Sequence, residues 1–410
     1  MTRILFVDDE SKILDGLRRM LRGMRQQWEM VFVEGGALAL DLLAREHFDI
    51  VVTDMRMPGM DGVALLSQVR QLYPHMARII LSGHSDQEVV MKSVRLAHQY
   101  LAKPCDHEKL QKVLQQAASM RQFLVQDNLI SLVTQIEALP SMPATHTRLL
   151  EALDAEDGSL EKIGQLISQD MGMTALMLKL VNSAFFGLQR HIASPQQAVA
   201  LLGLEIIRGL VLSQGLFNAL EPQQFPGMSF QELWRHSLAV GAYAKTIVQL
   251  EGEDQTLVDN AFIAGMLHDV GKLVLATVAR KEYIQVIQAV RQQDRLVAAV
   301  ELEVLGTSHA RAGAYLMGLW GLSEEIVVAV ALHNKPVFTS SSGGRKGRLL
   351  LAAVHAANVL EHELCVIHPG YARPKLDRGF MAEANLIDNV PHWRQACQQI
   401  STWEGANGTV

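Results

Sequence analysis

The sequence predicts an α/β domain with a parallel sheet, followed by an all-α domain. Over about the first 120 residues, short apolar segments of strand length alternate with helical patterns. This is the order of elements in a parallel sheet that helices cover on both faces. From about residue 130 the apolar residues follow a helical period almost throughout. The 410 residues are enough for two or three domains, each with its own core.

The bounds of the domains follow from these patterns. We expect an α/β domain in residues 1–120, a connector helix in 106–139, an all-α domain in 130–365 and a C-terminal extension in 366–410. The connector overlaps both domains because its helical pattern begins inside the first. The extension has mixed composition and is expected to add a helix near 391–402.

The first domain is expected to contain a five-stranded sheet. Its predicted strands are residues 3–7, 29–33, 49–53, 78–81 and 99–101, and its predicted helices are 11–22, 36–46, 62–72 and 86–97. Such doubly wound sheets bind their ligands beyond the carboxyl ends of the strands. Residues that follow the strands are therefore the candidates for function.

Polar side chains stand at several of these strand ends. Asp8 and Asp9 follow the first strand, Asp54 ends the third, Ser82 ends the fourth, and Lys103 follows the fifth. Three carboxylates at adjacent strand ends repel one another unless a hard cation such as Mg²⁺ lies between them. One alternative is that an acid at a strand end caps the following helix. Capping would explain one acid, but not the whole set.

These residue types suit a phosphate-acceptor site. A carboxylate can accept a phosphoryl group covalently, and Asp54 is the candidate. Lys103 would pair with the added negative charge, and Ser82 would donate a hydrogen bond to a phosphoryl oxygen.

The first domain resembles the receiver domain of two-component response regulators. The matching motifs are Val7-Asp8-Asp9-Glu10, Asp54-Met55-Arg56-Met57-Pro58-Gly59-Met60-Asp61-Gly62, Leu81-Ser82-Gly83 and Lys103-Pro104. The resemblance implies a flavodoxin-like fold in which Asp54 takes phosphate from a sensor histidine kinase. It also implies that the domain catalyses its own phosphorylation and dephosphorylation. Phosphorylation of Asp54 is therefore the expected input to this chain.

The resemblance also assigns roles to the residues around Asp54. Mg²⁺ would be bound by Asp9, Asp54 and the backbone carbonyl of Arg56, with Asp8 assisting. Ser82 and Tyr100 would form the switch pair, with the aromatic ring swinging inward when the hydroxyl moves toward the phosphate. For Tyr100 the alternative is a half-buried aromatic residue of the strand. The Lys103-Pro104 bond would be cis.

The connector shows a helical pattern from Asp106 to Pro140 without an intervening Gly or Pro. Its apolar residues recur at three- and four-residue steps, as in the seam of a coiled coil, at Leu110, Val113, Ala117, Met120 and Leu124. Such a helix would carry the state of the first domain onward through a homodimer. The alternative is an amphipathic helix that lies on its own domain.

The second domain is expected to be an all-α bundle. Its predicted helices are residues 144–154, 159–169, 172–182, 195–202, 204–220, 230–250, 256–268, 280–291, 298–305, 308–318, 323–332 and 348–363. Ser159 and Ser323 precede acidic helix starts and are predicted N-caps.

Histidines mark the candidate site of this bundle. His236 lies upstream, and His268-Asp269 ends an apolar helix. Burying this His-Asp pair is costly unless hydrogen bonds or a metal satisfy it. His309 and His333 complete a set of imidazoles and one carboxylate that suits Zn, Fe, Mn or Ni. Taken singly, each histidine is more often a satisfied core residue than a ligand.

The second domain resembles the HD superfamily of metal-dependent phosphohydrolases, and more closely its HDOD branch of bacterial signalling proteins. The matching motifs are Leu139-Pro140-Ser141-Met142-Pro143, Leu180-Val181-Asn182-Ser183, Ala200-Leu201-Leu202-Gly203, Trp234-Arg235-His236-Ser237, His268-Asp269-Val270-Gly271-Lys272 and Trp320-Gly321-Leu322-Ser323. Catalytic members require His, His-Asp and a final Asp as metal ligands. His236, His268 and Asp269 match, but Asn358 stands where the final acid is expected.

A second departure follows His333. The cyclic-di-GMP phosphodiesterase branch has another His and a Glu there, followed by Gly-Tyr-Pro, whereas this chain has Asn334-Lys335-Pro336. We therefore expect a binding module without a bound metal in this domain, rather than a phosphohydrolase. The alternative is a phosphorylation-gated, metal-dependent phosphodiesterase that acts on a cyclic dinucleotide or nucleotide.

The composition indicates which binding partners and which cellular compartment to expect. The formal charge is −6, so no overall basic field attracts nucleic acid, and no DNA-binding motif is present. The three cysteines show no metal-ligand spacing, which favours a reducing cytoplasm. We find no signal-peptide pattern and no uninterrupted apolar run of the ~18 residues that a membrane span needs. We expect a cytoplasmic response regulator whose partners are a sensor histidine kinase and a downstream signalling protein.

Overall fold

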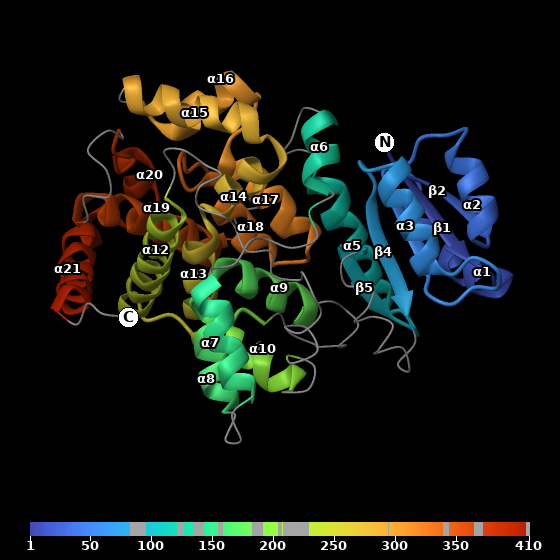
Figure 1. Ribbon diagram of the computed structural model, residues 1–410, viewed down its shortest axis with the longest axis horizontal. Coiled ribbons are helices and arrows are strands. Elements are labelled where there is room, and N and C mark those ends of the chain that lie inside the picture. Colours follow the sequence, from blue (N-terminus) through green and yellow to red (C-terminus); the bar gives the residue numbers. More distant parts are fainter. Residues whose placement is uncertain are drawn as a thin grey trace.

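The structure is a computed structural model. It describes residues 1–82, 96–120, 127–134, 136, 143–154, 159–182, 192–203, 207, 229–293, 295–338, 344–364 and 372–406. The N-terminal α/β part lies to the right in Figure 1, the helical part lies to the left, and α5 and α6 lie between them. Most of the predicted helices 86–97 and 204–220, and Leu124 of the predicted seam, fall outside the described residues.

The N-terminal part forms the predicted five-stranded parallel sheet. Its elements are β1 (Thr2–Asp8), α1 (Ser11–Met20), η1 (Arg22–Met24), β2 (Trp28–Glu34), α2 (Gly36–Leu43), β3 (Ile50–Asp54), α3 (Gly62–Leu72), β4 (Ala77–Ser82) and β5 (Gln99–Ala102). The strand order is β2-β1-β3-β4-β5. The order reverses at β1, so the ends of β1 and β3 lie side by side at the switch point where ligands bind.

The two faces of the sheet belong to different hydrophobic cores. Leu5, Val51 and Ile80 face a core that α2 and α3 cover, and Tyr100 lies in the same core. Residues of the opposite face, such as Phe6 and Leu81, pack in a core that includes α1 and α5. This second core continues without a break into the helical part. The N-terminal part and the helical part of the chain therefore share this second core.

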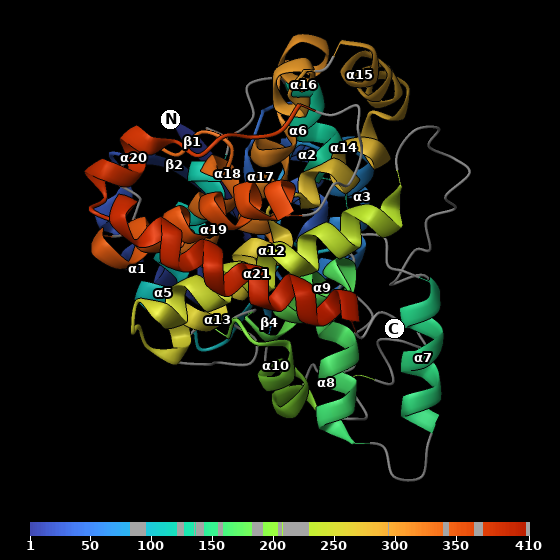
Figure 2. The same cartoon turned by 90° about the vertical axis from the view of Figure 1, so that its left-hand side faces the viewer.

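The helical part is an all-α arrangement, as predicted. Its elements are α5 (His107–Met120), α6 (Asp127–Thr134), α7 (Pro143–Asp154), α8 (Leu160–Ser168), α9 (Met171–Val181), α10 (Pro195–Leu202), α12 (Phe230–Leu250), α13 (Gln255–Leu267), α14 (Val270–Val278), α15 (Arg280–Gln293), α16 (Val297–Leu305), α17 (His309–Leu319), α18 (Glu324–Leu332), α19 (Gly344–Leu364), α20 (Arg378–Glu383), η4 (Ile387–Asn389) and α21 (Val390–Ala406). In Figure 2, α21 lies on the outer side of α12 and α19.

One of the two predicted N-caps is confirmed. Ser159 caps α8 by accepting a hydrogen bond from the backbone N–H of Lys162. Ser323 precedes α18, but its hydroxyl does not accept the capping hydrogen bond. Helix α14 was not among the predicted helices, although most of its residues are buried.

The connector packs within its own chain. Leu110, Ala117 and Met120 of the predicted seam are buried in the shared core, and α5 contacts α17. The final part of the prediction was wrong, since α6 ends at Thr134 and Ile136 is not helical. The packing agrees with an amphipathic helix that lies on its own chain, and homodimerisation stays a prediction.

Among the described residues, one helical stretch is long and apolar enough to cross a membrane. It is Gln255–Val278, with a mean hydropathy of 1.5 over an 18-residue window, and 78% of that window is buried inside the fold. The sequence analysis missed it because His268, Asp269 and Lys272 interrupt the apolar run. The burial shows that this stretch supplies core helices.

Candidate functional site

The carboxyl edge of the sheet brings Asp8, Asp54 and Lys103 together. The Lys103 ammonium donates to Asp8 Oδ2 at 2.8 Å and forms an ion pair with Asp54 Oδ1. The other oxygen of Asp54 accepts the backbone N–H of Arg56 at 3.0 Å. The side chains of Asp8 and Asp54 are 1% and 12% exposed, so one lysine balances two largely buried acids. Three residues predicted from separate strand ends are thus in direct contact.

The loop after β3 is shaped by its glycines. A Cβ atom at Gly62 would lie 2.0 Å from the backbone oxygen of Asp54, so only glycine fits there. Gly59 adopts a positive φ of 76°, which glycine tolerates without strain. Asp61 then caps α3 by accepting from the backbone N–H of Ala64 at 2.7 Å. The loop therefore returns tightly beside Asp54 and holds its carboxylate at the edge of the sheet.

The remaining predicted residues surround this contact. Asp9 is exposed and lines an open cleft of about 550 Å³ together with Arg56, Met57 and Asp61. Ser82 is fully buried at the end of β4, and its carbonyl accepts the N–H of Lys103 at 2.7 Å. The Lys103-Pro104 bond is cis. Tyr100 is 1% exposed, which places its ring inside the core rather than half-buried.

Burial and the neighbouring charges determine the protonation of Asp54 and Lys103. Burial raises the pKa of Asp54, and the hydrogen bond from Lys103 only partly offsets this effect. For Lys103, burial alone would lower the pKa, but Asp54 and Asp8 outweigh it and the pKa is raised. Lys103 therefore remains charged at neutral pH, and Asp54 is less stable as a carboxylate than an exposed aspartate.

The helical part brings all five predicted histidine and aspartate residues into one buried cluster. The two oxygens of Asp269 face different pairs of imidazoles. Oδ2 lies 3.6 Å from His236 Nε2 and 3.4 Å from His268 Nε2, and Oδ1 lies 3.2 Å from His309 Nε2 and 3.8 Å from His333 Nε2. The side chains of all five residues are at most 4% exposed. We call this set the histidine cluster.

The backbone fixes the tautomer of two of these imidazoles. His268 Nδ1 lies 2.6 Å from the carbonyl of Gly265, and His333 Nδ1 lies 2.8 Å from the carbonyl of Val330. A carbonyl only accepts, so Nδ1 carries the proton in both rings and a neutral Nε2 has a bare lone pair. Within the described part of the chain, His333 Nε2 has no hydrogen-bond partner. The unprotonated Nε2 atoms of His268 and His333 therefore direct their lone pairs at the Asp269 carboxylate. A cation bound between these nitrogens and the carboxylate would relieve the repulsion between them.

The spacing of the ligand atoms fits a metal ion. His236 Nε2 lies 3.2 Å from His268 Nε2, and both lie within 3.6 Å of Asp269 Oδ2. Ligand atoms around a tetrahedral ion with bonds of ~2.1 Å lie about 3.4 Å apart. Lys272 already contributes one positive charge, because its ammonium lies 2.5 Å from Asp269 Oδ2.

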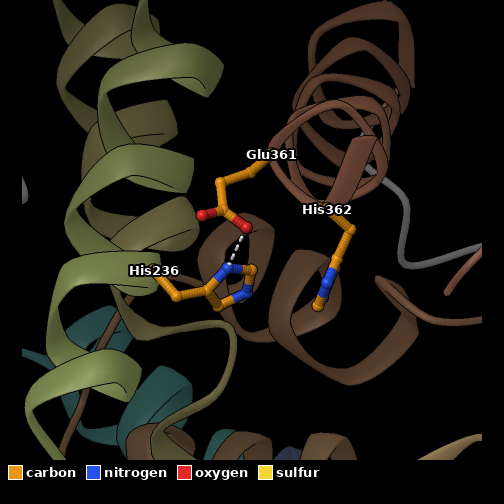
Figure 3. A group of neighbouring side chains, drawn as sticks. All are labelled: His236, Glu361 and His362. Carbon is orange, nitrogen blue, oxygen red and sulfur yellow. Dashed lines mark hydrogen bonds and ion pairs between the residues drawn. The ribbon is translucent and has the colours of Figure 1, made fainter. Parts of the chain in front are cut away.

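Two buried glutamates that the sequence analysis missed contact the Nδ1 atoms of two histidines in the cluster. Glu361 of α19 lies 2.5 Å from His236 Nδ1, and Glu301 of α16 lies 2.6 Å from His309 Nδ1. Figure 3 shows Glu361 pointing at His236 from the neighbouring helix, with the ring of His362 beside them. The signal in the sequence was an acid inside an apolar helical segment, which is costly unless it has a partner.

Burial and the neighbouring charges set the protonation of the cluster. Burial lowers the pKa of His236 to about 4 and that of His268 to about 3. For His309, burial alone would lower the pKa, but Glu301 and Asp269 raise it to about 9. Burial also raises the pKa of Glu361 to about 7. At neutral pH two imidazoles beside Asp269 Oδ2 are thus neutral and able to act as ligands.

Comparison with known families agrees with this architecture. The model of the response regulator receiver domain matches residues 4–115, and the model of the HDOD domain matches residues 139–336.

Several proteins are similar to parts of the chain. An uncharacterized protein of Treponema pallidum is 27% identical over 204 residues, which are 50% of this chain and 39% of that protein. The DNA-binding transcriptional regulator NtrC of Escherichia coli is 38% identical over 114 residues, which are 28% of this chain and 24% of that protein. The chain thus spans well under half the length of these relatives.

Solved structures are similar as well. The MmoQ response regulator of Methylococcus capsulatus is 25% identical with a TM-score of 0.48, and the alignment covers 63% of this chain and 98% of that one. The signal receiver domain of an HD domain-containing protein from Pseudomonas fluorescens is 32% identical with a TM-score of 0.28, covering 30% of this chain and 97% of that one. On the evidence of both family models, the chain belongs to the response regulators and joins a receiver domain to an HDOD domain.

Proposed function

We propose that Asp54 accepts a phosphoryl group from a sensor histidine kinase, and that this changes how the HDOD domain binds a downstream signalling protein. The observation that carries the proposal is the contact of the Lys103 ammonium with both Asp8 and Asp54. Transfer would break the N–P bond of a phosphohistidine and form an O–P bond at Asp54. Lys103 would then stabilise the added negative charge.

Mg²⁺ is part of the proposal. Asp8, Asp9, Asp54 and the backbone carbonyl of Arg56 would hold it, since all four offer the oxygen ligands that Mg²⁺ prefers. Asp9 lines the open cleft, so the ion and the phosphoryl donor have access from solvent. The bound ion neutralises charge on the transferring group.

Ser82 and Tyr100 would report the phosphorylation. Ser82 ends β4 next to β5, and its hydroxyl would donate to a phosphoryl oxygen. Tyr100 lies in register with Ile80 of β4, two residues before Ser82. A shift of Ser82 toward Asp54 would therefore change the packing of β4 against β5.

A phosphorylation assay tests the first half of this proposal. Purified protein is incubated with Mg²⁺ and acetyl phosphate, and the intact mass is measured. We expect one phosphoryl adduct in the wild type and in Asp15→Asn, an exposed control on α1, and none in Asp54→Asn. An adduct that persists in Asp54→Asn would show that Asp54 is not the acceptor.

A binding assay tests the second half. Partners are captured on immobilised wild type and on Asp54→Asn, each with and without acetyl phosphate. We expect a protein whose retention changes with phosphorylation of the wild type only. Equal retention of every captured protein under all conditions would contradict a role of phosphorylation in partner binding.

We also propose that the histidine cluster binds a transition metal ion. The bare Nε2 atoms of His268 and His333 beside the Asp269 carboxylate favour this second candidate function. His236, His268 and Asp269 would be the ligands, with His333 and His309 at the other oxygen of Asp269. The bound ion would supply positive charge to the buried carboxylate. Hydrolysis is not part of the proposal, because the resemblance to the catalytic members would place Asn358 where they need the final acid.

A further inference from the structure

Helix α17 begins in the histidine cluster and ends on the receiver domain. Its first residue, His309, places Nε2 3.2 Å from Asp269 Oδ1. Its last residue, Leu319, accepts a hydrogen bond from the side-chain amide of Gln99 in β5 at 3.1 Å. An α-helix of this length spans about 16 Å. One helix therefore joins the histidine cluster to the first residue of β5.

The start of α17 is held tightly against α14. A Cβ atom at Gly271 would lie 1.7 Å from the backbone oxygen of His309, and one at Gly313 would lie 3.0 Å from the backbone nitrogen of Gly271. The backbone N–H of His309 also donates to the buried Glu301 at 2.8 Å. Because α14 follows directly after Asp269, α17 cannot slide without disturbing the contact between His309 and Asp269.

The end of α17 is held by the receiver domain and the connector. A Cβ atom at Gly318 would lie 1.9 Å from Sδ of Met120, so the end of α5 packs directly on the helix backbone. The hydroxyl of Tyr315 lies 2.9 Å from Thr134 Oγ1 of α6. Gln116 of α5 donates to the carbonyl of Leu322, just beyond the helix, at 2.6 Å. The contacts of Met120 and Tyr315 are on the helix itself and are buried, so they transmit displacement rather than absorb it.

Gln99 connects this end of α17 to the switch residues. It precedes Tyr100 in β5, and side chains of consecutive strand residues point to opposite faces. Tyr100 packs in the core under α2 and α3, while Gln99 reaches the helical domain on the other face. A movement of β5 that repositions Tyr100 therefore displaces the Gln99 amide as well.

We propose that α17 couples the phosphorylation site to the histidine cluster through Gln99, so that phosphorylation of Asp54 changes the environment of His309. This proposal rests on the proposed phosphorylation of Asp54. The coupling acts in both directions, since two linked sites change each other's free energies equally. An ion or partner bound at the histidine cluster would then alter the stability of the phosphorylated receiver.

Hydrogen exchange measured by mass spectrometry tests the coupling in the full chain. The phosphoryl mimic beryllofluoride is added with Mg²⁺, and exchange is followed in the peptide that covers residues 306–319. Binding at Asp54 is measured separately by ¹⁹F NMR. In the wild type we expect beryllofluoride to change the exchange rates of this peptide by several-fold.

The matched variants are Gln99→Met and Gln116→Met. Both remove an amide that donates to a backbone carbonyl of the HDOD domain, but only Gln99 lies in β5 and bonds the helix itself. We expect Gln99→Met to bind beryllofluoride and to lose most of the response in residues 306–319. Gln116→Met should keep the response. Met120→Ala is a further variant that loosens the contact on Gly318 without leaving a polar group unpaired, and it should reduce the response.

The outcomes separate the two proposals. A wild type that binds beryllofluoride without any change in residues 306–319 would overturn the coupling and leave the proposed phosphorylation intact. A full response in Gln99→Met and in Met120→Ala would overturn the route through the end of α17. Absence of beryllofluoride binding in the wild type would overturn the proposed function, and the coupling with it.

Discussion

Glu361 lies 2.5 Å from Nδ1 of His236, the ring nitrogen that does not face Asp269. Glu361 is on α19 one helical turn after Asn358. The acid that α19 places beside His236 is therefore at Nδ1 of the imidazole rather than at Nε2. A carboxylate in this position orients a histidine ligand and increases its basicity.

Replacing this acid should weaken metal binding without abolishing it. We expect Glu361→Gln to reduce the affinity of the histidine cluster for Zn²⁺ by about 10- to 100-fold, as is usual for groups that support a ligand. The affinity is measured by isothermal titration calorimetry with protein stripped of metal. Glu363→Gln is the control, because Glu363 is half-exposed on the same helix and pairs with Arg394. It should leave the affinity unchanged.

The titration also tests the metal site itself. His268→Ala should remove binding, because His268 Nε2 is one of the three proposed ligand atoms, with His236 Nε2 and Asp269 Oδ2. If the wild type takes up no Zn²⁺, Mn²⁺ or Co²⁺, the proposed metal site is wrong. Equal affinities for the wild type and Glu361→Gln would contradict the role given to Glu361.

The sequence was sufficient to predict one site and only part of the other. Asp8, Asp54 and Lys103 could be placed because the carboxyl ends of parallel strands share one edge of a sheet. Helices give no comparable rule, since the helices that carry Glu301 and Glu361 meet the histidines only through tertiary packing. The contact of Gln99 with Leu319 joins residues 220 positions apart, and no local pattern marks either of them.

Removing the ammonium from the acceptor site should destabilise the receiver domain. Lys103→Met leaves Asp8 and Asp54 close together without their shared cation. We expect a loss of about 2 kcal/mol in the free energy of unfolding at pH 7, measured with urea. Since burial raises the pKa of Asp54, the loss should shrink as the pH falls and this carboxylate becomes protonated.

Lys12→Met, at an exposed position of α1, is the control for this change and should not alter the stability. Mg²⁺ should stabilise Lys103→Met more than the wild type, because the bound ion replaces the missing charge. A constant difference between Lys103→Met and the wild type from pH 7 to pH 4 would contradict this explanation.

Two glycines should respond to alanine in opposite ways. At Gly271 the added methyl group would meet the backbone oxygen of His309, which cannot rotate away, and we expect a loss of more than ~3 kcal/mol. At Gly16, inside α1, no atom lies within 4 Å of the new Cβ. Gly16→Ala should therefore gain about 0.5 to 1 kcal/mol through its better helix propensity. Thermal and urea unfolding measure both; a mild effect of Gly271→Ala would show that α14 and α17 can separate easily.

The interface between the two domains should weaken in acid because of His98. This histidine precedes β5 and is 2% exposed. Its Nδ1 accepts the backbone N–H of Arg78 at 2.9 Å, so the proton of the neutral ring is on Nε2, which donates to the carbonyl of Thr134 at 2.8 Å. Burial holds the pKa of His98 well below the ordinary range, and the charges of Arg78 and Lys179 lower it further.

The sign of the pH dependence follows from this lowered pKa. Below about pH 6.5 the unfolded chain binds a proton at His98 that the folded chain does not, so stability is lost as the pH falls. One such proton changes the free energy of unfolding by about 1.4 kcal/mol per pH unit. We expect His98→Gln, which does not titrate, to lower the slope between pH 6 and pH 5 by about this amount. Urea unfolding at several pH values measures the slope, and the exposed His107→Gln is the control that should leave it unchanged. If His98→Gln shows the slope of the wild type, protonation of His98 is not coupled to the packing of the two domains.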